Sequence, residues 1–117
     1  MPITKREAHY GSPKQLINYI LDEKHNGEKV GQISGVNCNP ETALLEFKDI
    51  QRKYKMKGSR VAYHIIQSFS PKDNITEEQA NEIGKKLCEE LYPNFQCIIS
   101  THIDKGHIHN HICLNAI

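Results

Sequence analysis

Residues 101–115 constrain the fold more than any other stretch, because three histidines alternate there as His-x-His-x-His. Successive side chains of a β-strand point to opposite faces, so His107, His109 and His111 would share one face. Apolar residues such as Ile108 would share the other face. The pattern therefore predicts a strand with a stripe of imidazoles on one side and an apolar stripe on the other.

A second short strand is predicted over residues 98–103, and the turn-forming residues that follow it predict a β-hairpin. With a two-residue or a four-residue loop, His102 faces His109 across the hairpin, at a Cβ distance of about 4.5–5.5 Å. His102, His109 and His111 would then form a three-histidine facial site with open coordination positions. A three-residue loop would turn His102 to the opposite face.

Imidazole chemistry indicates what such a cluster could do. Neutral imidazole is the commonest side-chain metal ligand, and two histidines at positions i and i+2 of a strand can converge on one ion. We therefore expect His102, His109 and His111 to bind a divalent cation, with His107 and His64 as secondary candidates. The alternative is a half-exposed strand that carries histidines for no functional reason.

Length and composition favour one soluble domain. The chain has 117 residues, of which 38% are hydrophobic, and its mean hydropathy is -0.61. No apolar run approaches the ~20 residues of a membrane span, and the first residues do not resemble a signal peptide. We expect a cytoplasmic protein with no membrane contact and with free cysteines.

Helix and strand signals alternate along the chain. Helix starts are predicted at Ser12-Pro13, at Asn39-Pro40 and at Thr76, the last with a capping box. Residues 60–69 form the clearest strand, with both faces fairly apolar. This order predicts an α+β fold, in which an antiparallel or mixed sheet has its helices packed mainly on one face and carries the histidine motif on a C-terminal hairpin.

A basic run follows the second predicted helix. Residues 52–60 hold five cations, one tyrosine and no acidic residue, and such a run can follow the phosphates of a nucleic acid. The alternative is a solvated helix end. The candidate DNA-binding residues are Arg52, Lys53, Lys55, Lys57 and Arg60.

Tyr19 is a candidate nucleophile. It lies roughly 130° from the centre of the apolar face of the first predicted helix, at the margin of the core. A metal ion could polarise a phosphodiester, and a phenolate can attack phosphorus and hold a covalent intermediate. Asp104, on the histidine face in the proposed register, could orient an imidazole or help to activate the tyrosine.

These residues resemble the motifs of a known family. The segment from His102 to Asn115 closely resembles the third motif of relaxases, the mobilisation endonucleases of the MobP and VirD type. Residues 63–71 resemble their central strand, and residues 16–20 resemble their tyrosine helix. In one departure from the pattern, Asn110 replaces the usual hydrophobic residue between the paired histidines.

The resemblance implies an endonuclease of the histidine-hydrophobic-histidine (HUH) class with a ferredoxin-like sheet. Such enzymes nick one strand at the transfer origin of a plasmid or transposon and stay attached to the 5′ phosphate through tyrosine. Carried over by position, Tyr19 is the nucleophile, the three histidines hold Mg²⁺ or Mn²⁺, with Zn²⁺ as an alternative, and Asp104 supports them. The implied partners are single-stranded DNA at the origin and accessory proteins of the relaxosome.

Three further expectations concern the extent of the chain and the rival functions. We expect residues 1–117 to be a relaxase catalytic domain and the N-terminal part of a longer protein, which could be inactive by itself or self-associate through an exposed sheet edge. A rolling-circle replication initiator is one alternative. A non-catalytic nucleic-acid-binding domain with a structural metal is the other.

Overall fold

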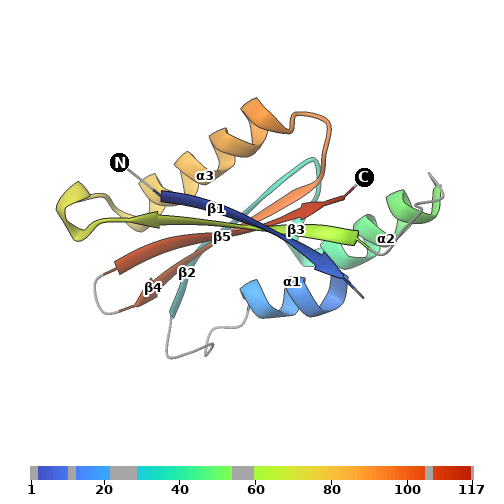
Figure 1. Cartoon of the computed structure of the whole chain (residues 1–117), viewed down its shortest axis with the longest axis horizontal. Helices are drawn as coiled ribbons and strands as arrows, with labels where there is room; N and C mark the ends of the chain where they lie inside the picture. Colours follow the sequence, from blue (N-terminus) through green and yellow to red (C-terminus); the bar gives the residue numbers. More distant parts are fainter. Residues whose placement is uncertain (1–2, 11–12, 22–28, 54–59, 105–106, 117) are drawn as a thin grey trace.

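The computed structural model describes residues 3–10, 13–21, 29–53, 60–104 and 107–116. Strands and helices alternate along this part of the chain (Figure 1). In chain order they are β1 (Ile3–Tyr10), α1 (Pro13–Leu21), β2 (Lys29–Val36), α2 (Ala43–Lys53), β3 (Arg60–Phe69), α3 (Glu77–Leu91), β4 (Cys97–Asp104) and β5 (His107–Asn115), with short 3₁₀ turns at Pro40–Thr42 and Pro71–Asp73.

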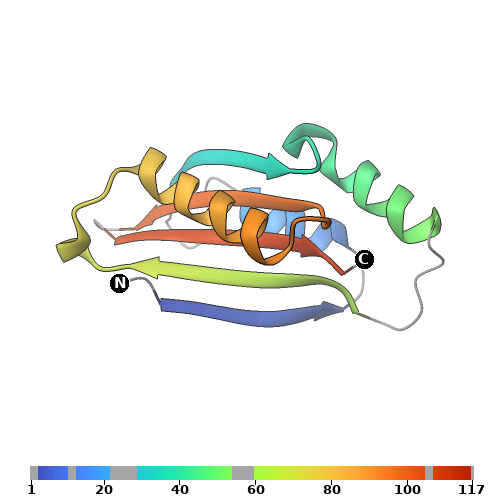
Figure 2. The same cartoon turned by 90° about the horizontal axis from the view of Figure 1, so that it is seen from above.

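The strands form one sheet in the order β1-β3-β5-β4-β2, and each neighbouring pair is antiparallel. The histidine strand β5 therefore lies in the centre, between β3 and β4, while β1 and β2 form the edges (Figure 2). The predicted α+β class and antiparallel sheet are confirmed. A central position holds β5 by hydrogen bonds on both sides, which fixes the faces to which its side chains point.

The helices cover both faces of the sheet, so the expectation that they pack mainly on one face is wrong. Helix α3 lies on one side, and α1 and α2 lie on the other (Figure 1). The cause is that the central strands are apolar on both faces. Ile98 and Cys113 are buried under α1 and α2, whereas Ile99 and Ile112 are buried on the α3 side.

Local signals place the helix starts where the sequence predicts them. The Thr76 side chain accepts a hydrogen bond from the backbone N–H of Gln79, and the Gln79 side chain accepts one from the backbone N–H of Thr76. Helix α3 begins directly after Thr76, at Glu77. Asn39 caps a 3₁₀ turn that leads into α2. Helix α1 begins at Pro13, as predicted, and is described to Leu21.

The hairpin has the register of a two-residue loop. Ile103 pairs with Ile108, His102 pairs with His109, and Ser100 pairs with His111. Opposed residues share a face, so the predicted placement of His102 opposite His109 is confirmed.

Asn110 anchors β5 to the α3 side through a buried polar network. Its side-chain amide donates to Gln67 Oε1 at 2.9 Å and to the Ala80 carbonyl at 2.6 Å, and its oxygen accepts from Thr101 Oγ1 at 2.7 Å. A Cβ atom on Gly84 would lie 2.7 Å from Asn110 Nδ2, so the glycine allows α3 to approach the sheet here. These contacts explain why a fully buried polar residue occupies this position.

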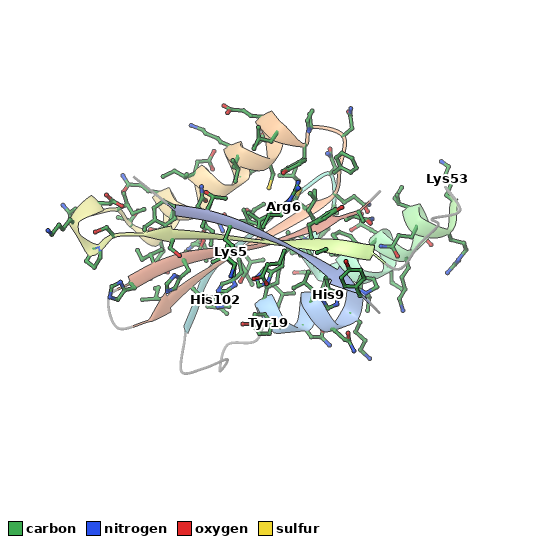
Figure 3. The ribbon with its side chains drawn as sticks, in the orientation of Figure 1. Lys5, Arg6, His9, Tyr19, Lys53 and His102 are labelled. Atoms are coloured by element: carbon green, nitrogen blue, oxygen red, sulfur yellow. The ribbon has the colours of Figure 1, made fainter. Side chains whose placement is uncertain are left out.

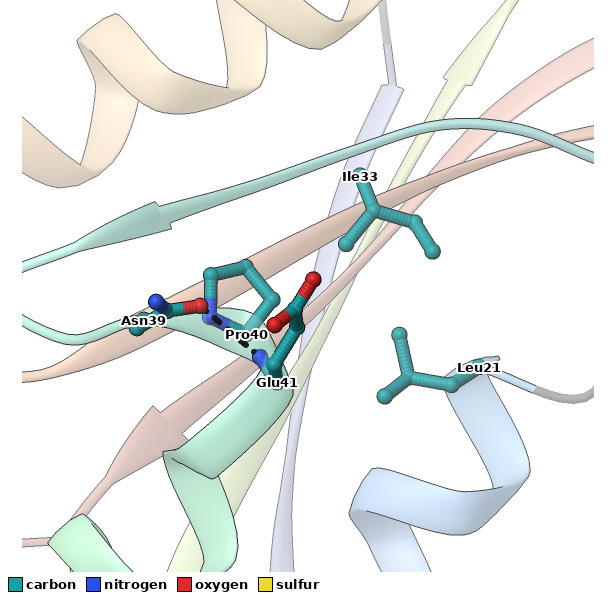
Figure 4. A pocket seen from close by; sticks show the side chains of 5 residues that line it. All are labelled: Leu21, Ile33, Asn39, Pro40 and Glu41. Atoms are coloured by element: carbon teal, nitrogen blue, oxygen red, sulfur yellow. Dashed lines mark hydrogen bonds between the residues drawn. The ribbon is translucent and has the colours of Figure 1, made fainter.

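A groove of about 390 Å³ lies between the end of α1, the edge strand β2 and the turn before α2 (Figure 4). Its lining side chains are Leu21, Ile33, Asn39, Pro40 and Glu41. These residues include one carboxylate and no cation, so they do not form a phosphate-binding surface. Among the described helices, none is long and apolar enough to cross a membrane.

Candidate functional site

The hairpin histidines lie on the face of the sheet that α1 covers. The His102 ring is fully buried, and its centroid lies 4.3 Å from that of His111. The His109 ring lies 6.3 Å from His111, further toward the hairpin end of β5. His102, His109 and His111 are therefore neighbours, as the alternation of the strand and the hairpin register predict.

A hydrogen bond joins this cluster to α1. The Nε2 atom of His102 lies 2.6 Å from the carbonyl oxygen of Ile20 and 3.1 Å from Ser100 Oγ. The carbonyl can only accept, so the His102 N–H donates to it. The last four carbonyls of a helix lack helical partners, and Ile20 lies in the last turn of α1. His102 thus ties the end of this helix to the hairpin.

Tyr19, the residue before Ile20 on α1, packs against two of the histidines. Its ring makes edge contacts with His64 at 5.7 Å and with His111 at 6.0 Å between centroids. The side chain remains 38% exposed, so a substrate could reach the hydroxyl from solvent. Figure 3 shows Tyr19 on α1 below the sheet, near His102. The structure therefore brings together the tyrosine and histidines that the sequence places far apart.

His64 joins the cluster from β3, the strand between β1 and β5. Its Nε2 atom lies 3.0 Å from Nδ1 of His111, and the two rings are stacked. Burial lowers the pKa of the His64 imidazole, whereas the negative charge of Glu7, its cross-strand partner on β1, acts in the opposite direction. His64 is a member of the cluster rather than a distant core histidine.

Asp104 and His107 lie at the turn end of the hairpin, as the last residue of β4 and the first residue of β5. Their backbones are paired, and the His107 side chain is exposed. The side chain of Asp104 lies outside the described residues, so its predicted role stays a prediction. The backbone alternation places Asp104 on the same face as His102.

The three predicted ligands fit a divalent cation by donor chemistry and by shared face. Their rings are not closed around one point: among the described residues, no three histidine, cysteine or acidic side chains are arranged to hold an ion. His102 Nε2 is bonded to the Ile20 carbonyl and His111 Nδ1 is bonded to His64, so a cation would bind each of these two rings through its other nitrogen.

A pocket of about 420 Å³ opens beside Tyr19. It is lined by Glu7, His9, Gln15, Leu16, Tyr19, His64 and Ile66. The sequence reasoning missed Glu7, His9 and Gln15, although Glu7 and His9 alternate on β1 in a way that places both on the face of His64. Their polar groups give the pocket donors and acceptors next to the tyrosine.

The basic run is only partly described. Arg52 and Lys53 are exposed in the last turn of α2, and Arg52 lies 3.9 Å from Asp49. In Figure 3, Lys53 lies at the far end of α2, well away from Tyr19. Lys55 and Lys57 lie outside the described residues, and Arg60 begins β3. The two cations of this run whose side chains are described, Arg52 and Lys53, are therefore separate from the tyrosine–histidine cluster.

Comparison with known proteins finds one family model and several related sequences that match most of the chain. The family model described as "Relaxase: MobA/VirD2-like, nuclease domain" matches residues 19–117. "Protein rlx" of Staphylococcus aureus is 40% identical over 114 residues, which are 97% of this chain and 34% of that protein. The "Group II intron-interrupted relaxase LtrB" of Lactococcus lactis is 38% identical over 81 residues, covering 68% of this chain and 14% of the relative. The chain thus spans about a third of the length of the rlx relatives.

A solved structure described as "Molecular Basis of Vancomycin Resistance Transfer in Staphylococcus aureus" has the same fold. Its TM-score is 0.64 at 15% identity, over 98% of this chain and 70% of that one. At this level of identity the likeness concerns the fold alone.

Proposed function

The chain belongs to the relaxase family, as a MobA/VirD2-like nuclease domain, and we propose that it nicks one strand of DNA at a transfer origin to initiate conjugative mobilisation. The observation that carries this proposal is the contact of Tyr19 with His64 and His111. An exposed phenol beside a cluster of imidazoles has the parts needed for attack on a phosphodiester.

In the proposed reaction, the hydroxyl oxygen of Tyr19 attacks the scissile phosphorus. A bond forms between that oxygen and phosphorus, the bond from phosphorus to the 3′ oxygen breaks, and the phenolic proton leaves to a base. The departing 3′ oxygen takes up a proton from solvent, so the products are a 5′-phosphotyrosyl linkage and a free 3′ hydroxyl on the other fragment. Attack by that hydroxyl on the linkage would reseal the original strand, whereas attack by the 3′ hydroxyl of another strand end would transfer the strand and release Tyr19.

His102, His109 and His111 would hold a divalent cation, Mg²⁺ or Mn²⁺, with Zn²⁺ as an alternative. Such an ion polarises a phosphodiester and stabilises charge on its oxygens. The bond from His102 to Ile20 supports this assignment, because ligating histidines usually donate their second N–H to a carbonyl or carboxylate. Asp104, two residues along the same strand face, is proposed to orient one of these imidazoles.

Single-stranded DNA at the transfer origin is the proposed substrate. The pocket beside Tyr19 offers Glu7, His9 and Gln15 to an unstacked base, and the cations at the end of α2 would contact more distant phosphates. Accessory DNA-binding proteins are proposed partners, self-association would use the edge strands β1 or β2, and the proposed location is the cytoplasm.

The His109→Ala variant tests the metal site. We expect Mn²⁺ to bind this variant at least about tenfold more weakly, because the variant lacks one of three ligands. Calorimetry measures the affinity, and nicking of a supercoiled plasmid with a transfer origin should fall in parallel. Chelation with EDTA should stop nicking by the unsubstituted protein.

The matched control is Glu82→Ala, which removes an exposed carboxylate from α3, on the other face of the sheet. It should bind Mn²⁺ as the unsubstituted protein does. An unchanged Mn²⁺ affinity in His109→Ala would refute the ligand assignment. Retention of one zinc ion without nicking would favour the non-catalytic alternative.

A further inference from the structure

His64 is bonded to one of the proposed metal ligands although it lies outside the histidine hairpin. Its Nε2 atom is 3.0 Å from Nδ1 of His111, and the ring planes meet at 27° with centroids 5.2 Å apart. Pairing of β3 with β5 sets His64 opposite Cys113, two residues from His111 and on the same face. The pairing of β3 with β5 therefore places the two imidazoles next to each other.

Each neutral imidazole has one N–H donor and one acceptor nitrogen, so one of the two rings donates in this hydrogen bond and the other accepts. If His64 donates, His111 carries its own hydrogen on Nε2 and has no lone pair there for a cation. If His111 donates from Nδ1, its Nε2 lone pair is free. The direction of one hydrogen bond thus decides whether His111 can bind a cation through Nε2.

We propose that His64 is a positioning residue that accepts the Nδ1–H of His111 and thereby keeps Nε2 of His111 unprotonated for a divalent cation. This inference rests on the proposed function, because it takes His111 as a ligand. A ligating histidine ordinarily donates its second N–H to an acceptor, and His64 Nε2 lies within hydrogen-bond distance of His111 Nδ1.

The surroundings of His64 hold its ring in place. Strand β3 lies between β1 and β5, so His64 has Glu7 on one side and the His111 strand on the other. The Tyr19 ring makes edge contacts with both imidazoles. These neighbours hold the orientation of the His64 ring, so that its Nε2 stays directed at Nδ1 of His111.

The tautomers can be measured without any metal. The chain labelled with ¹⁵N-histidine is studied by long-range ¹H–¹⁵N NMR at a pH about two units above the ordinary imidazole pKa of ~6.5. We expect His111 to carry its hydrogen on Nδ1, and His64 to have an unprotonated Nε2. A hydrogen on Nε2 of His111 would overturn the proposal.

Two substitutions provide a second test. His64→Gln keeps an acceptor close to the position of Nε2, whereas His64→Leu removes it. We expect Mn²⁺ to bind His64→Leu about 10–100-fold more weakly in calorimetry, and His64→Gln to retain most of the affinity. Equal affinities for the two variants would contradict the role of the acceptor.

His109→Ala separates this inference from the proposed metal site. If His109→Ala and His64→Leu both weaken Mn²⁺ binding, both assignments are supported. If only His109→Ala does so, the metal site stands and the role of His64 is refuted. If His109→Ala has no effect, the metal site itself fails.

Discussion

Tyr19→Phe is expected to abolish covalent attachment of the protein to single-stranded DNA. The phenylalanine ring keeps the edge contacts with His64 and His111 but has no oxygen to bond to phosphorus. Loss of the nucleophile should lower the rate of adduct formation by on the order of 10⁴-fold or more. The assay incubates an oligonucleotide carrying the transfer origin with protein and Mn²⁺, and separates adducts on a denaturing gel.

Tyr10→Phe is the matched control. Tyr10 ends β1, 57% of it is exposed, and it does not line the pocket beside Tyr19. This variant should form adducts as the unsubstituted protein does. Adducts that persist in Tyr19→Phe and disappear in Tyr10→Phe would assign the nucleophile to Tyr10.

Asn110→Leu is expected to lower the free energy of unfolding by about 2–4 kcal/mol, although leucine would restore the hydrophobic residue usual between the paired histidines. The variant leaves the Ala80 carbonyl, Gln67 and Thr101 without their buried partner. Leucine must also fit where Gly84 is already in close contact with the sheet. Urea unfolding, followed by circular dichroism, measures the change.

A double variant separates the polar loss from the packing change. Gln67→Met in the Asn110→Leu background removes the buried side-chain oxygen that the first substitution leaves without its donor, and should recover part of the lost stability. Unchanged stability in Asn110→Leu would show that the network on the α3 side does not hold the histidine strand.

The sequence predicts those parts of the site that depend on local patterns. Alternation along β5 gives the shared face of His109 and His111, and turn residues of the hairpin give the opposition of His102. Likewise, the Thr76–Gln79 capping box sets the start of α3 from neighbouring residues alone. Each of these features needs only residues that are close in sequence.

Features that depend on distant elements were not predictable in the same way. The coverage of both sheet faces follows from where α1, α2 and α3 pack, which no local pattern specifies. The bond from His102 to the Ile20 carbonyl requires that α1 packs against the histidine face of the sheet. Glu7 and His9 line the pocket because β1 pairs with β3 beside α1. Asn110 departs from the family pattern, and its partners, Ala80 on α3 and Gln67 on β3, are distant in sequence.

Mass spectrometry of the trapped adduct tests the central claim most directly. Trypsin should release residues 15–24 as a peptide whose only tyrosine is Tyr19, and residues 7–14 as one whose only tyrosine is Tyr10. After nuclease treatment of the adduct, we predict a nucleotide linked through its 5′ phosphate to Tyr19 in the first peptide. A nucleotide on any other tyrosine, or no modified peptide from a protein that nicks DNA, would contradict the account.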